Sequence, residues 1–84
     1  MGNIMKWYKV RVTFRHNPIG FIGFLEDNDW GFIRKVSQLE YIIEAPAAPS
    51  EAPEDVLESI YGYIDSELSC CGCGGPMKSI RYEK

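Results

Sequence analysis

The sequence has little of what catalytic and membrane-bound domains usually need. It holds one histidine in 84 residues, so acid–base chemistry built on imidazole would rest on His16 alone. Its longest apolar stretch, residues 19–25, is too short to span a bilayer or to form the core of a signal peptide. No phosphate-binding or dinucleotide-binding glycine pattern occurs. These absences favour a cytoplasmic protein that is not an enzyme, with no cofactor and no membrane partner.

The sequence also lacks the excess of bases that is typical of nucleic-acid-binding domains. Its net charge is −3 and its isoelectric point is about 5.0. The charges are uneven along the chain, because residues 1–24 carry four bases and no acid, whereas residues 25–69 carry eleven acids and two bases. We therefore expect a dipolar surface, which bears on the choice of partner more than on the fold.

Residues 6–15 show the clearest strand pattern. Apolar side chains alternate with basic or polar ones, and alternate residues of a strand point to opposite faces. The apolar set is Tyr8, Val10, Val12 and Phe14, and the other set is Trp7, Lys9, Arg11, Thr13 and Arg15. The pattern predicts a half-buried strand with one apolar face and one basic face that also carries a tryptophan.

Two segments in the middle of the chain give mixed signals. Residues 19–25 are apolar, hold two glycines and follow a turn at Pro18, so we expect a second strand with a bulge or a close backbone approach, paired with the first as a hairpin. Residues 30–44 fit one face of a helix and also fit two short strands. We favour a strand for residues 39–44 and leave residues 30–37 open.

Residues 51–68 carry the strongest helical signal. Ser50 fits the N-cap position, and Leu57, Ile60, Tyr61, Ile64 and Leu68 form one apolar stripe. The helix holds no base and six acids, which are Glu51, Glu54, Asp55, Glu58, Asp65 and Glu67. A glycine inside a helix costs about 1 kcal/mol relative to alanine, so its presence calls for a structural reason. We expect that Gly62 permits a close approach of the helix to the sheet.

The pattern of residues 77–83 predicts a final strand, with Ile80 and Tyr82 on its inner face. At this length the chain, residues 1–84, is expected to form a single domain. The elements combine into an α+β fold, in which a small, mostly antiparallel sheet of three to five strands carries one main amphipathic helix, about residues 51–68, on one face. Cationic side chains would then remain exposed on the opposite face.

The basic face of the first strand is one candidate binding surface, formed by Trp7, Lys9, Arg11 and Arg15. Bases beside an aromatic residue on an open sheet bind single-stranded nucleic acid in several small folds, through phosphate contacts and base stacking. The alternative, which we favour, is that these cations pair with acids on neighbouring strands.

The acidic side of the helix is a second candidate, with Glu54, Asp55 and Glu58 as its binding residues. Six acids without a base repel one another, which points either to simple solubility or to a basic partner. The alternative is an ordinary solvated helix face, which is the commoner case.

The cysteines are a third candidate. Cys70 and Cys73 form a C-x-x-C pair followed by glycine, which is the local pattern of a zinc knuckle. Structural zinc needs four ligands, and only Cys71 and His16 remain, so we favour free thiols over a site built on Cys70, Cys73 and His16. A redox role is disfavoured as well, because the pair follows the end of a helix, where the dipole does not lower a thiol pKa.

No family motif is recognisable in the sequence. We predict a non-enzymatic interaction module that binds another protein through the acidic helix or the basic, tryptophan-bearing sheet face. The alternatives are a small nucleic-acid-binding domain, with zinc at the Cys70–Cys73 loop, and a thiol redox protein. The small size and general character of the chain suggest a viral or mobile-element accessory protein, but no particular residue supports this hypothesis.

Overall fold

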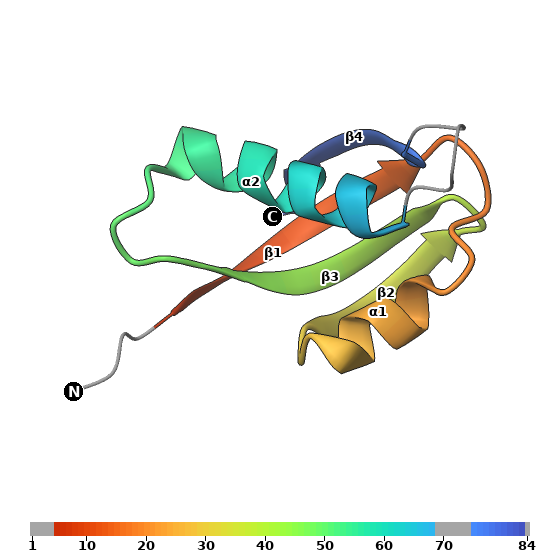
Figure 1. Cartoon of the computed structure of the whole chain (residues 1–84), viewed down its shortest axis with the longest axis horizontal. Coiled ribbons are helices and arrows are strands. Elements are labelled where there is room, and N and C mark those ends of the chain that lie inside the picture. The colour runs from red at the N-terminus through yellow and green to blue at the C-terminus, as the bar shows by residue number, and fades with distance from the viewer. Residues whose placement is uncertain (1–4, 69–74, 84) are drawn as a thin grey trace.

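The computed structural model describes residues 5–68 and 75–83. Its elements follow one another as strand, helix, strand, strand, helix and strand (Figure 1). They are β1 (Lys6–Phe14), α1 (Phe21–Asp27), β2 (Gly31–Ser37), β3 (Glu40–Ala47), α2 (Pro53–Leu68) and β4 (Met77–Tyr82). This arrangement confirms the predicted α+β class.

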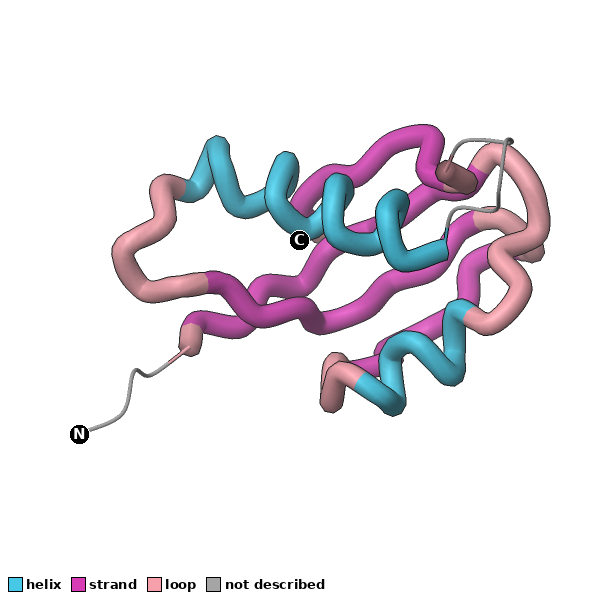
Figure 2. Tube along the Cα trace, viewed as in Figure 1, coloured by secondary structure: helices cyan, strands magenta, loops and turns pink. Residues whose placement is uncertain are grey.

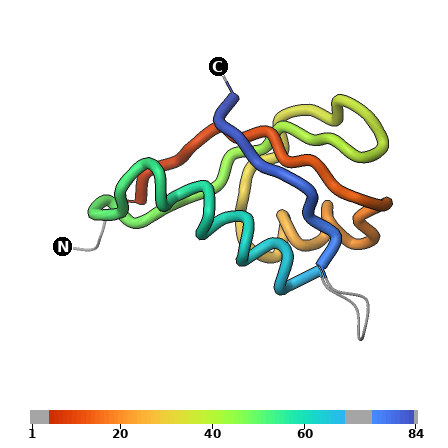
Figure 3. Tube along the Cα trace, turned by 90° about the horizontal axis from the view of Figure 1, so that it is seen from above, coloured from red at the N-terminus to blue at the C-terminus, as the bar shows by residue number. Residues whose placement is uncertain are grey.

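The four strands form one antiparallel sheet in the order β2-β3-β1-β4. Val10 of β1 lies opposite Ile43 of β3 on one side and opposite Tyr82 of β4 on the other. Both helices lie on the same side of the sheet, as Figures 2 and 3 show, and no helix or strand of the described residues covers the other side. This order of elements is that of the ferredoxin-like, or split β-α-β, motif. Among the residues that the structure describes, one face of the sheet is therefore open.

α2 confirms the predicted main helix, which begins slightly later than expected. Val56, Ile60 and Ile64 are its buried residues and pack in the core against the sheet. The backbone N–H of Val56 donates to the carbonyl of Ala52 (3.1 Å), so Ala52 occupies the cap position that we predicted for Ser50. Pro53 suits the first helical position because its missing N–H would have no partner there.

The strand predicted for residues 19–25 is wrong, because α1 occupies this part of the chain. Phe21, Phe24 and Leu25 are buried together, and their spacing is that of one helix face rather than of a strand. Gly20 takes a left-handed backbone conformation (φ 84°) at the start of the helix. At the other end, the Asn28 side-chain amide donates to the carbonyl of Phe24 at 2.9 Å.

Residues 30–44 form strands rather than a helix. β3 confirms the strand favoured for residues 39–44, and the segment left open, residues 30–37, forms β2. β2 is an edge strand whose pairing with β3 shifts register twice. All of β2 after Gly31 is exposed, so its side chains contribute little to the core.

The core lies between the sheet and the two helices. The apolar face predicted for β1 is buried, since Val10 and Val12 are 0% exposed and Phe14 is 1% exposed. Aromatic rings join β1 to α1 and β3, with the Phe21 ring 4.9 Å from Phe14 and 5.1 Å from Tyr41. The other buried residues of this core are Phe24, Leu25, Ile43, Ala45, Ala47, Val56, Ile60, Ile64 and Met77. Ile42 is also buried, but it lies opposite Arg11 on the other face of the sheet.

Gly62 does not approach the sheet, so that expectation is wrong. The residue is exposed, and a Cβ added there would meet nothing within 4 Å. The tight contact lies instead at Gly75, where an added Cβ would collide with the Asp65 carboxylate. That carboxylate accepts a hydrogen bond from the backbone N–H of Met77 (3.0 Å) and so ties α2 to the start of β4.

Candidate binding surfaces

The open face of the sheet carries the cations predicted for it, but its central cation is paired within the chain. The Arg11 guanidinium donates from Nε to Glu83 Oε1 (2.9 Å) and from Nη2 to Glu83 Oε2 (3.3 Å). Its Nη1 lies 3.3 Å from Glu40 Oε2 on β3. Arg11 is thus held from both sides, by β3 and by the residue that follows β4.

The pKa values of Arg11 and Glu83 shift in the directions expected for an ion pair. The hydrogen bond from Arg11 lowers the pKa of the Glu83 carboxyl, which partial burial opposes. The same hydrogen bond raises the pKa of Arg11, and Glu40 adds to that effect. Both shifts favour the charged forms, so the charge of Arg11 is neutralised locally by two carboxylates.

The other predicted residues of this face do not form one compact site. Trp7 is 48% exposed near the start of β1, and Lys9 lies opposite Glu44 of β3. Arg15 follows the end of β1 and donates from Nη2 to the carbonyl of Gly75. Since a strand rises about 3.3 Å per residue, Trp7 and Arg15 are about 26 Å apart. The structure therefore spreads these side chains along the whole strand.

The acids on the outer side of α2 have no such partners. Glu54, Asp55 and Glu58 are exposed, and we refer to these three residues as the acidic face. Within residues 5–68 and 75–83, both ion pairs involve Arg11, so no Lys or Arg pairs with the acidic face. Glu54 and Asp55 lie in the first turn, where the positive end of the helix dipole offsets part of their repulsion.

Tyr82 of β4 packs against the start of α2, next to the acidic face. Its hydroxyl donates to the carbonyl of Pro53 (2.5 Å), so the ring lies against the first turn of α2. The pKa of Tyr82 is raised, first by burial and then by the nearby Tyr8, Glu54 and Glu51.

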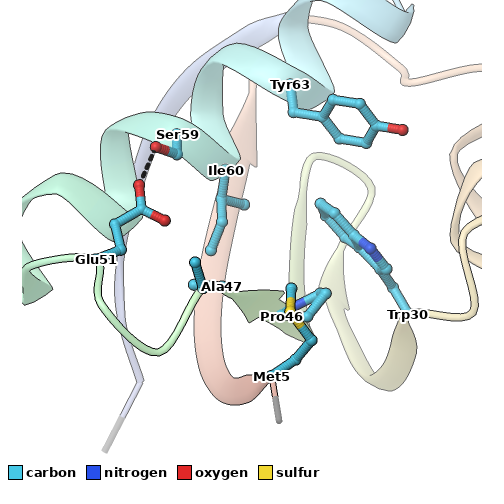
Figure 4. Close-up of a pocket in the computed structure, with 9 residues that line it drawn as sticks. Met5, Trp30, Pro46, Ala47, Glu51, Ser59, Ile60 and Tyr63 are labelled. Carbon is cyan, nitrogen blue, oxygen red and sulfur yellow. Dashed lines mark hydrogen bonds between the residues drawn. The ribbon is translucent and has the colours of Figure 1, made fainter. Parts of the chain in front are cut away.

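A hollow that the sequence did not reveal opens beside the first turns of α2 (Figure 4). Its volume is about 320 Å³, and we call it the aromatic hollow. Figure 4 shows Trp30 and Tyr63 on one side of it and Glu51 with Ser59 on the other. Its lining residues are Met5, Trp30, Pro46, Ala47, Ala48, Glu51, Ser59, Ile60 and Tyr63. They come from separate segments of the chain, which is why sequence spacing gave no signal.

The predicted metal site lies largely outside the described residues, because Cys70 and Cys73 fall between residues 68 and 75. His16 is exposed and lines a hollow with Leu68 and Pro76, which lie close to the two ends of that gap. Within the described ranges, no group of three or more His, Cys, Asp or Glu side chains could hold a metal ion. Zinc binding at the cysteines therefore stays a prediction.

The described part of the chain contains no helix that is both long and apolar enough to cross a membrane. Comparisons with models of protein families, with curated proteins and with solved structures find no match to this chain.

Proposed function

We propose that this protein is a non-enzymatic interaction module that binds a basic segment of another protein through the acidic face of α2. One observation supports the proposal above all. Among the described residues, Arg11 on the sheet is paired with Glu83 and Glu40, whereas the acidic face pairs with no cation.

The difference in pairing matters for binding. A ligand that approaches Arg11 must compete with two carboxylates already in contact with it. A cationic ligand that approaches Glu54, Asp55 or Glu58 displaces only water and free ions. Charge of one sign over a surface also speeds encounter with a partner of the opposite sign. A basic segment is therefore the ligand that this surface fits best.

The open sheet face supports the alternative, nucleic-acid binding, less well. Trp7 offers an exposed ring for base stacking. However, phosphate binding needs available cations, and Arg11 at the centre of this face is already paired with Glu83 and Glu40. This leaves Lys9 as the cation of β1 on this face without an ion pair among the described residues. We therefore favour the acidic face over the open face of the sheet as the binding surface.

Charge reversal tests the proposal. The probe is a fluorescein-labelled peptide of repeated Lys-Gly-Ser units, followed by fluorescence anisotropy. Asp55→Lys combined with Glu58→Lys replaces attraction by repulsion at the acidic face. Exposed pairs contribute about 0.2–1 kcal/mol each, and each reversal replaces one attraction by a repulsion of similar size, so two reversals should weaken binding by about 0.8–4 kcal/mol, which is about fourfold or more.

The matched control is Glu26→Lys combined with Asp27→Lys, which changes the net charge equally on the exposed surface of α1. This control is expected to retain most of the affinity. Equal losses in the two double variants would mean that net charge alone attracts the peptide, and the proposal would then be wrong.

A further inference from the structure

We infer that the aromatic hollow receives an arginine side chain of the basic partner. The inference rests on the proposed function, since it names the residue that would anchor the partner beside the acidic face. Three features of the hollow support it: an aromatic wall, an apolar floor and a carboxylate on the opposite rim (Figure 4).

The aromatic wall is held in place by its neighbours. The rings of Trp30 and Tyr63 lie 5.6 Å apart at an angle of 37°. Phe24 contacts both, at 5.2 Å from Trp30 and 5.6 Å from Tyr63. The Tyr63 hydroxyl also donates to Asn28 Oδ1 (2.7 Å). A ligand therefore meets rings whose positions are already fixed, which reduces the entropy lost on binding.

The floor and the volume suit one long side chain. Ala47 and Ile60 are buried at the base of the hollow, and the small alanines at positions 47 and 48 leave space above it. A volume of about 320 Å³ is at the lower end of the range for ligand pockets. The methylene stem of a basic residue can cover such an apolar surface while its charged head stays near the rim.

The rim of the hollow provides the carboxylate of Glu51, which can still accept a hydrogen bond from a ligand. Glu51 lines the hollow, and its Oε2 accepts the Ser59 hydroxyl. Its Oε1 makes no hydrogen bond with the described residues, so it can accept one from a ligand. Asp55 of the acidic face precedes Ser59 by about one turn of α2, so it adds negative charge on the side of the helix where Ser59 contacts Glu51.

An arginine side chain fits the aromatic wall, apolar floor and carboxylate of the hollow better than a lysine side chain. A guanidinium is planar, is weakly hydrated and stacks on aromatic faces, whereas an ammonium is a compact and strongly hydrated charge. Cations are bound best over tryptophan among the aromatic side chains. A guanidinium can also donate to a carboxylate while its plane lies on a ring. The hollow offers both contacts at once, from Trp30 and Glu51.

The experiment uses the intrinsic fluorescence of Trp30. Trp7→Phe leaves Trp30 as the only tryptophan, because the chain has two. This variant is titrated with a peptide of repeated Arg-Gly-Ser units and, separately, with the Lys-Gly-Ser peptide. The arginine peptide should change the Trp30 emission and bind about threefold to fivefold more tightly, as expected for a cation over an aromatic ring.

Two variants in the same background test the site itself. Glu51→Gln removes the rim carboxylate, and Ser59→Leu fills the hollow from an exposed helical position where leucine is a good helix former. Each should abolish the preference for arginine. Glu67→Gln is the matched control, because it removes the same charge from the last turn of α2, outside the lining of the hollow, and should keep the preference. Circular dichroism verifies that each variant is folded.

The outcomes separate this inference from the proposed function. If both peptides bind equally, or if Glu51→Gln and Ser59→Leu change nothing, the hollow is not the arginine site, although the acidic face can still bind. If neither peptide binds, the proposed function and the inference fail together. If the arginine preference depends on Glu51 but binding survives reversal of Asp55 and Glu58, the hollow is the anchor and the acidic face is not.

Discussion

Replacing Gly62 with alanine is expected to stabilise the protein. Gly62 lies inside α2, its backbone is helical, and a Cβ there would meet nothing within 4 Å. The methyl group therefore creates no clash, while alanine loses less backbone entropy than glycine when the helix forms. The expected gain is about 0.5–1 kcal/mol in the free energy of unfolding. For a domain of this size, 1 kcal/mol corresponds to a shift of about 4–8 °C in the melting temperature.

Urea unfolding followed by far-ultraviolet circular dichroism measures this gain. The midpoint should rise while the dependence on denaturant concentration stays unchanged, because the surface exposed on unfolding is nearly the same. A lower midpoint for Gly62→Ala would refute the reasoning. It would mean that position 62 approaches another part of the chain, as the sequence suggested, and that the outer side of α2 is not free.

The remaining predictions concern the two contacts that hold β4. Gly75→Ala should destabilise the protein by about 1.5–3 kcal/mol in urea unfolding, because the new Cβ would displace the Asp65 carboxylate from the Met77 N–H; an unchanged midpoint would show that the carboxylate moves without cost. Glu83→Gln should lower stability at neutral pH and have no effect in strong acid. The pKa of Glu83 is lowered in the folded state, so its pairing with Arg11 stabilises the fold above the unfolded pKa, about 4.3, and is lost as the pH falls through the folded pKa. A difference between wild type and variant that is constant across this pH range would contradict the pairing.

The sequence predicted the elements whose pattern repeats over enough residues. β1 shows several alternations of apolar and polar side chains, and the stripe of α2 covers several turns. α1 has only 7 residues, so two glycines and a run of apolar side chains concealed the helical spacing of Phe21, Phe24 and Leu25. A short helix is stabilised by burial of such a face more than by its own propensity.

The candidate surfaces were predictable only where they lie on one element. The acidic face follows from the spacing of Glu54, Asp55 and Glu58 within a single helix. The pairing of Arg11 with Glu83 joins residues 72 positions apart and depends on β4 lying beside β1. The aromatic hollow depends on three strand ends, a loop and α2 meeting at one corner, and no local pattern encodes that meeting.

The central claim is that this chain presents negative rather than positive charge for binding. The most direct test compares two fluorescein-labelled probes, the Lys-Gly-Ser peptide and single-stranded oligothymidylate, by anisotropy at the same low salt concentration. We predict that the peptide binds, that added salt weakens its binding, and that the oligonucleotide does not bind. Binding of the oligonucleotide that Lys9→Glu abolishes, without binding of the peptide, would contradict the account and place the function on the open face of the sheet.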